Sequence, residues 1–235
     1  MGSKGIGKRR GGDRVNQLTI QRHGTNTEGR DFFVGDIHGQ YGLLLEAMAR
    51  VGFNRQCDRM FSVGDLIDRG KESYQCLSLA FEPWFHGVRG NHEMLAHDAL
   101  LAPDEDGRAF LFWVMNGGTW IHGESLKEVS SVLADALEHL PYAREVATAG
   151  KRVGIVHAEP PEDWTQLEST DPYTLLWGRN RIHQEDTTHV VNIDDVVVGH
   201  TILYEPVVMG NVHYIDTGAF YTGRLTLAQA EDLLG

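Results

Sequence analysis

The 235-residue sequence is poor in cysteine and lacks long apolar runs, and each absence excludes a class of protein. Its two cysteines, Cys57 and Cys76, are too few for a disulfide framework and do not form a metal-binding motif, so we expect a reducing, cytoplasmic setting. No apolar run approaches the roughly 18 residues of a membrane span, and the basic N-terminus has no apolar signal-peptide core. We therefore expect no membrane partner.

Positive charge is concentrated at the N-terminus. Residues 1–30 contain seven Lys or Arg and two Asp or Glu, a net charge of +5. Since the whole chain has a net charge of −12, the remaining residues have a net charge of −17. The first segment is also rich in glycine and polar residues, which predicts a basic, flexible extension over residues 1–30 and one folded domain over residues 31–235. The strongly acidic body disfavours a nucleic-acid partner.

Three short apolar stretches each lead through glycine to a side chain with an oxygen ligand. They read VGDIHG (residues 34–39), FSVGDLIDRG (61–70) and FHGVRGNHE (85–93). The oxygen ligands are Asp36, Asp65 and Asn91. His38 stands two residues after Asp36, on the same side of an extended chain, so both side chains can reach one point.

A helical pattern follows each of these stretches, over residues 40–51, 72–80 and 93–101. The alternating order predicts parallel strands, and ligands of such sheets bind beyond the carboxyl ends of the strands. The oxygen ligands fall at those ends. A further amphipathic pattern over residues 124–140 predicts a helix that packs on the core.

The second half of the chain supplies nitrogen ligands. VGIVHA and VVVGH are two β-branched stretches that run directly into His157 and His200. The chain has no evident structural reason to place an imidazole at these points, which favours metal ligation. We expect structural or solvated roles for eight other histidines, namely His23, His86, His97, His122, His139, His183, His189 and His213.

The six candidate ligands are three oxygen donors and three nitrogen donors, without a thiolate. They exceed the needs of one tetrahedral zinc and suit two harder divalent ions, Mn²⁺ first, with Fe or Zn as alternatives. Two ions about 3.5–4 Å apart can clamp the attacking and departing oxygens of a displacement at phosphorus. We expect Asp65 to bridge them.

The ordered motifs GDIHG, GDLIDRG, RGNHE, VHA and GHT resemble the phosphoprotein phosphatase family, within the metallophosphoesterase superfamily. The resemblance is closest to bacteriophage and bacterial serine/threonine phosphatases, extends through PWF, NGG, LLWGR and YIDTGA, and covers about residues 31 to 227. It implies an α/β (α+β), calcineurin-like metallophosphoesterase fold. That fold is a β-sandwich of two mixed sheets flanked by helices, with metals at the strand ends of one edge.

The resemblance also implies residue roles. Asp36, His38 and Asp65 would hold one metal, and Asp65, Asn91, His157 and His200 the other, with a bridging hydroxide as nucleophile and no covalent phosphoenzyme. His92 would be the general acid, oriented by Asp68. Arg69, Arg89 and Arg179 would bind phosphate through paired donors, with Arg181 as a rival to Arg179. Asp216 would orient a ligand.

Three functions remain open. The first is a protein serine/threonine phosphatase that hydrolyses phosphomonoesters of phosphoproteins, with phosphotyrosine as a further substrate. The second is a symmetrical diadenosine tetraphosphatase. Its expected motif loops have no equivalent of Asp68 or Arg89, so the presence of both residues here favours a monoester substrate. The third is an inert, metal-stabilised binding domain, which predicts eroded ligand positions, and the sequence shows none.

Overall fold

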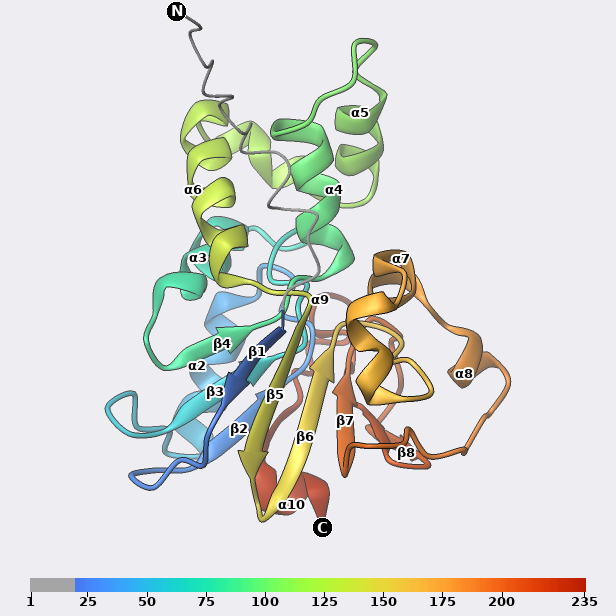
Figure 1. Ribbon diagram of the computed structural model, residues 1–235. Helices are drawn as coiled ribbons and strands as arrows, with labels where there is room; N and C mark the ends of the chain where they lie inside the picture. Colours follow the sequence, from blue (N-terminus) through green and yellow to red (C-terminus); the bar gives the residue numbers. More distant parts are fainter. Residues whose placement is uncertain (1–19) are drawn as a thin grey trace, which may run out of the picture.

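Two β-sheets and the helices around them form the part of the chain that the computed structural model describes, residues 20–235 (Figure 1). Both sheets contain parallel and antiparallel pairs, and helices flank them. The predicted fold class, two mixed sheets flanked by helices, is confirmed. No helix among these residues has the length and apolar character needed to cross a membrane.

The first sheet has the order β10-β2-β3-β4. Its strands are β2 (Asp31–Val34), β3 (Arg59–Ser62), β4 (Phe85–Gly87) and β10 (Leu227–Gln229). β2, β3 and β4 are mutually parallel, as the alternating sequence pattern predicts, and β10 joins β2 antiparallel. The carboxyl ends of the three parallel strands therefore meet at one edge.

The second sheet has the order β1-β5-β6-β7-β9-β8. Its strands are β1 (Ile20–His23), β5 (Ala143–Thr148), β6 (Lys151–Val156), β7 (Asp195–Val198), β8 (Val207–Met209) and β9 (Val212–Tyr214). β6, β7 and β9 are parallel. The ends of β6 and β7 carry the two predicted histidine ligands.

A buried apolar layer joins the two sheets. Phe33 and Phe61 are paired neighbours on β2 and β3, and they pack in one cluster with Val153, Ile155 and Val197 of the second sheet. All five are fully buried. Because side chains alternate along a strand, the other face of the first sheet packs on the helices. This layer fixes how the strand ends of the two sheets face each other.

The longer helices lie where the sequence periodicity predicts them. The predictions for residues 40–51, 93–101 and 124–140 correspond to α2 (Tyr41–Arg50), α4 (Asn91–Leu100) and α6 (Leu126–His139). The prediction for residues 72–80 corresponds to α3 (Ser73–Ser78) and the 3-10 helix η1 (Leu79–Phe81). α5 (Arg108–Met115) contacts α4, and α4, α5 and α6 stand together at one end of the molecule (Figure 1).

The remaining helices are short. They are η2 (Gly118–Gly123), η3 (Trp164–Ser169), α7 (Pro172–Trp177), α8 (Asn180–His183), α9 (Ala219–Thr222) and α10 (Ala230–Leu234).

The predicted flexible extension is wrong for residues 20–30. Strand β1 pairs in parallel with β5, with Ile20 opposite Ala143, so this segment completes the second sheet. Arg30 donates to the Asp58 carboxylate at 2.7 Å and anchors the entry to β2. Glycine and polar residues nearby masked the strand because it is only four residues long. Residues 1–19 lie outside the described residues.

Candidate metal centre

The six predicted metal ligands come from strand ends of both sheets. Asp36 and His38 follow β2, Asp65 follows β3, and Asn91 begins α4 after β4. His157 follows β6 and His200 comes two residues after β7. All six side chains are buried. Segments more than 160 residues apart in sequence meet here, since the His200 backbone N–H donates to the Asp36 carboxylate at 3.1 Å, a separation of 164 residues.

Two groups of side chains have the geometry to hold a cation. The ligand atoms of His38, Asp65 and His92 all lie within 4.8 Å of one another, and so do those of Asp65, His157 and His200. Asp65 belongs to both groups, as the prediction of a bridging carboxylate requires. Within residues 20–235, these are the groups of three or more His, Cys, Asp or Glu with such spacing.

The other two predicted ligands stand directly beside these groups. The Asn91 Oδ1 atom lies 2.8 Å from the His157 Nε2 atom. Asp36 is almost fully buried and accepts from the His200 backbone. The structure therefore brings all six residues together, and the assignment of each to one metal stays a prediction.

Backbone carbonyls orient the histidine rings. His38 Nδ1 lies 2.9 Å from the Ile67 carbonyl oxygen and His157 Nδ1 lies 2.7 Å from that of Val63. Each Nδ1 must donate to its carbonyl, which leaves the Nε2 lone pair facing Asp65. Burial lowers the pKa of His38 to about 3 and also lowers the pKa of His157, so both rings stay in the neutral form that binds metals.

The chemistry of the centre fits divalent cations. The His200 Nε2 atom is buried and has no hydrogen-bond partner within the described part of the chain, which is costly for a polar atom unless a metal takes its lone pair. Burial, together with the charges of Asp216 and Asp65, raises the pKa of Asp36 well above its ordinary value. Carboxylates crowded in this way favour bound positive charge.

Backbone strain is concentrated at the same place. Among the described residues, eight non-glycine residues have positive φ, and five of these are predicted site residues. They are His38, Asp65, Asp68, Arg69 and His200, with φ between 47° and 71°. Such conformations cost about 1–3 kcal/mol each and persist where the surroundings enforce them. Their clustering supports a functional site at these strand ends.

Glu93 is a supporting residue that the sequence reasoning missed. Its carboxylate accepts from the backbone N–H groups of Asp65 at 3.0 Å, Leu66 at 2.8 Å and Gly90 at 2.7 Å. It therefore ties two ligand loops together. Gly90 is required there, because a Cβ atom would approach the Asp65 Oδ1 atom to 2.0 Å. The signal was present in the quoted RGNHE motif, to which only Arg, Asn and His were assigned roles.

His92 and Asp68 form a buried pair at the edge of the centre. His92 Nδ1 lies 2.8 Å from Asp68 Oδ2, and His92 Nε2 lies 4.0 Å from Asp65. Burial lowers the pKa of His92, but the Asp65 and Asp68 carboxylates outweigh it and hold the pKa above the ordinary value. His92, predicted as an acid, also falls in the first cation-binding group, so the geometry allows either role.

Two of the predicted phosphate-binding arginines lie at the centre. Arg69 is exposed, its Nη1 lies 2.8 Å from His38 Nε2, and its guanidinium stacks 4.4 Å above the Phe220 ring. Arg179 is half-buried and donates to the His200 carbonyl at 3.4 Å. Its rival Arg181 is buried and donates to the carbonyls of Asp186 and Thr188, which is a structural role.

Arg89 occupies a different place from the other two arginines. Its buried guanidinium donates to the carbonyls of Leu140 at 2.7 Å and Leu137 at 2.9 Å, at the C-terminal end of α6, and stacks on Tyr142. A cation at this helix end satisfies otherwise unpaired carbonyls. These contacts make Arg89 a helix cap, and its phosphate role stays a prediction.

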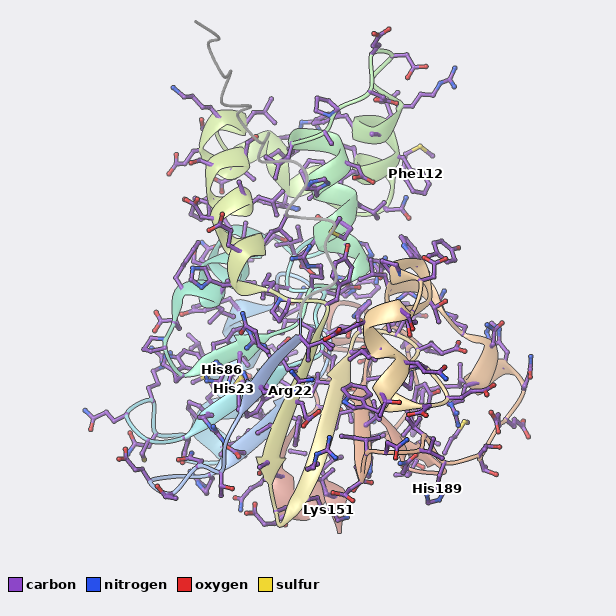
Figure 2. All side chains as sticks on the ribbon, in the orientation of Figure 1. Arg22, His23, His86, Phe112, Lys151 and His189 are labelled. Carbon is purple, nitrogen blue, oxygen red and sulfur yellow. The ribbon has the colours of Figure 1, made fainter. Side chains whose placement is uncertain are left out.

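The histidines expected to be structural lie outside both groups. His23 on β1 and His86 on β4 are neighbours, with ring centroids 4.7 Å apart (Figure 2). Asp195 lies 2.8 Å from the buried His213, and His189 is exposed (Figure 2). Asp216 is buried beside Asp36 and belongs to neither cation-binding group. Burial raises the pKa of Asp216 to about 6.

Comparisons with known proteins agree with this architecture. The chain is 38% identical over 203 residues to serine/threonine-protein phosphatase 1 of Salmonella typhimurium, which covers 84% of this chain and 90% of that protein. It is 25% identical over 260 residues to the symmetrical bis(5'-nucleosyl)-tetraphosphatase of Haemophilus influenzae, covering 86% and 94%.

A solved serine/threonine phosphatase from Saccharomyces cerevisiae has the same fold. The TM-score is 0.60 at 15% identity, covering 86% of this chain and 72% of that one. The family described as calcineurin-like phosphoesterase matches residues 32–221. The match spans every strand end that carries a predicted ligand. The chain therefore belongs to the calcineurin-like phosphoesterase family.

Proposed function

We propose that this protein is a metal-dependent serine/threonine protein phosphatase that hydrolyses phosphomonoesters of phosphoproteins. The observation that carries the proposal is the pair of cation-binding groups that share Asp65, with the His92–Asp68 pair beside them. The Salmonella relative, named as a serine/threonine phosphatase and 38% identical, supports the substrate class. We also propose a cytoplasmic location, which the two free cysteines support.

Two divalent ions fit the donor set. Asp36, His38 and Asp65 would hold one ion, and Asp65, Asn91, His157 and His200 the other. Mixed carboxylate, amide and imidazole donors without thiolate favour Mn²⁺, with Fe or Zn as alternatives. When bound, the ions supply Lewis acidity toward phosphoryl oxygens and acidify coordinated water.

The chain's own residues bind and orient the phosphoester. Arg69 and Arg179 border the centre and can place guanidinium donors on phosphoryl oxygens. His92 keeps its Nδ1 proton on Asp68, so Nε2 is the atom that can give a proton to the leaving oxygen. General acid catalysis of this kind is typically worth about 10²–10⁴-fold. Phosphoserine, a poor leaving group, needs it most.

A symmetrical diadenosine tetraphosphatase is the second candidate, because of the Haemophilus relative. The buried Asp68 argues against it, since the loop pattern expected for that enzyme has no equivalent of this residue. Asp68 is fully buried and hydrogen-bonded to His92, which supports a role beside that residue in the proposed site. A leaving group that requires a proton gives this pair a purpose.

The test removes metal from the full-length protein, restores Mn²⁺, and follows phosphate release from phosphoserine and phosphotyrosine peptides beside cleavage of diadenosine tetraphosphate. We expect metal-dependent turnover of the phosphoserine peptide. Preference for the dinucleotide would establish the second candidate. No turnover of any of these substrates in the presence of Mn²⁺, Fe²⁺ or Zn²⁺ would favour the alternative of an inert binding domain.

A further inference from the structure

The Asp68 carboxylate receives more hydrogen bonds than an acid–base pair requires. His92 Nδ1 lies 2.8 Å from Oδ2. The Trp113 indole nitrogen lies 2.9 Å from both carboxylate oxygens, and the Trp120 indole nitrogen lies 2.8 Å from Oδ1. The Ser73 hydroxyl holds the Asp68 backbone N–H. Two tryptophans thus donate to one fully buried carboxylate.

These tryptophans come from one continuous segment. Trp113 is the buried residue of α5, Trp120 lies on η2, and their rings meet edge to face with centroids 6.1 Å apart. Trp113 belongs to the buried apolar cluster and Trp120 packs against it. A core role explains this packing, but it does not explain why both N–H groups converge on Asp68.

The turn between the two tryptophans reads NGG and fastens the same loop. The Gly117 carbonyl accepts from the Arg69 backbone N–H at 2.9 Å. Gly117 has a φ of +116°, and a Cβ atom there would approach the Arg69 Cγ atom to 2.7 Å. Asp68 and Arg69 themselves have positive φ, at 71° and 67°. Residues 113–120 therefore hold the strained turn at Asp68 and Arg69 through both side-chain and backbone hydrogen bonds.

We infer that Trp113 and Trp120 are positioning residues for phosphoester cleavage, because their indole N–H groups fix the Asp68 carboxylate in the orientation that aims His92. The inference rests on the proposed role of His92 as the acid. In that step, an oxygen derived from water forms a new bond to phosphorus, the P–O bond to the leaving group breaks, and the His92 Nε2 proton moves to the leaving oxygen. The ring becomes neutral and keeps its Nδ1 proton on Asp68. The proton that the water gives up restores the acid for the next turnover.

The physical reason is rotational freedom. A carboxylate held only by His92 can turn about its Cβ–Cγ bond and present either oxygen to the ring, which displaces Nε2 from the line to the leaving oxygen. Indole donors that hold both carboxylate oxygens remove this freedom. Misplacement by about 1 Å can reduce catalysis by up to about 10²-fold.

The test compares Trp120→Phe and Trp113→Phe with a matched control, Trp84→Phe. Trp84 is a buried tryptophan of the same helical core, and its indole N–H donates to the Glu82 carboxylate at 2.9 Å. Each change removes one indole donor. Trp120 is only partly buried, so Trp120→Phe is the variant that retains the fold if Trp113→Phe does not.

Two readouts separate positioning from structure. We expect Trp120→Phe to lower kcat about 10-fold or more for a phosphoserine peptide and for phenyl phosphate, while kcat for dinitrophenyl phosphate stays within about two-fold, since a good leaving group needs no proton. The metal-free protein should also show a hydrogen-bonded His92 Nδ1–H proton in NMR spectra. This signal should shift or disappear in Trp120→Phe and persist in Trp84→Phe.

Equal losses on all esters, or unchanged NMR signals and rates in both variants, would overturn the inference. Failure of the proposed function looks different. If wild-type protein cleaves aryl phosphates but no phosphopeptide, the substrate assignment falls while the aryl series still tests the tryptophans. If the wild-type protein cleaves no ester, the NMR comparison decides.

Discussion

Binding of divalent metal should stabilise this protein strongly, and Asp65→Asn should abolish the effect. Asp65 is shared by both cation-binding groups, so one substitution weakens both. The His200 Nε2 atom is a buried nitrogen without a hydrogen-bond partner in the described part of the chain, and a metal would satisfy it. Because His200 belongs to only one of the two groups, His200→Ala should remove only part of the stabilisation.

The size of the effect follows from mass action. A ligand present at 100 times its dissociation constant stabilises the folded state by about 2.7 kcal/mol per site. For a chain of this length, 1 kcal/mol shifts the melting temperature by about 2–4 °C. One site thus predicts a shift of roughly 5–10 °C, and two independent sites predict about twice that.

The measurement is thermal unfolding by circular dichroism of metal-stripped protein, with and without added Mn²⁺, and metal content by elemental analysis on the same samples. The matched control is His189→Ala, an exposed histidine outside both groups (Figure 2). We expect the full shift in wild type and His189→Ala, an intermediate shift in His200→Ala, and none in Asp65→Asn. A full shift with two bound ions in Asp65→Asn would refute the shared-ligand geometry.

Three further predictions concern His92, His86 and Arg89. His92→Asn should retain metal and lose turnover on phosphoserine far more than on nitrophenyl phosphate; equal losses on both would rule out His92 as the acid. Burial lowers the pKa of His86 to about 3 and of His23 to about 4. Because these folded pKa values lie below the unfolded value of 6.5, burying the two neutral rings should contribute its full stabilisation above pH 6.5. This contribution should be lost as the pH falls from 6.5 through about 4 and 3. His86→Gln should reduce the loss in urea midpoint between pH 7.5 and pH 4.5, and an unchanged loss would contradict the reasoning. Arg89→Met should lower the free energy of unfolding by about 1–3 kcal/mol for each orphaned carbonyl, measured by urea denaturation.

The first half of the site was predictable because its chemistry is local in sequence. Asp36, Asp65 and Asn91 each follow a short apolar strand, and parallel pairing places the ends of such strands together. The helical patterns over residues 40–51 and 72–80 located α2, α3 and η1, which connect these strands. His157 and His200 were recognisable as imidazoles at the ends of β-branched stretches.

Features that depend on tertiary contact escaped the sequence. Strand β1 is four residues long in a polar setting, and only its pairing with β5 makes it a strand. Arg89 looks like its neighbours in the motif loops, yet the position of α6 turns it into a helix cap. Trp113 lies in the apolar core and the partly buried Trp120 packs against it, and only the place of Asp68 reveals the use of their N–H groups.

The centre is assembled by contacts that do not use the metal-facing atoms. The His157 ring is fixed through Nδ1 by the carbonyl of Val63, which directly follows β3 of the other sheet, and the His200 backbone N–H is held by the Asp36 carboxylate. The apolar layer between the sheets sets the spacing that makes these contacts possible. Because the ligands are held in place by other atoms, metal binding requires little rearrangement, and less of its free energy is lost to ordering side chains. Substitutions in that layer, such as Val197→Ala, should therefore weaken metal affinity as well as stability, although no residue of the layer is a predicted ligand.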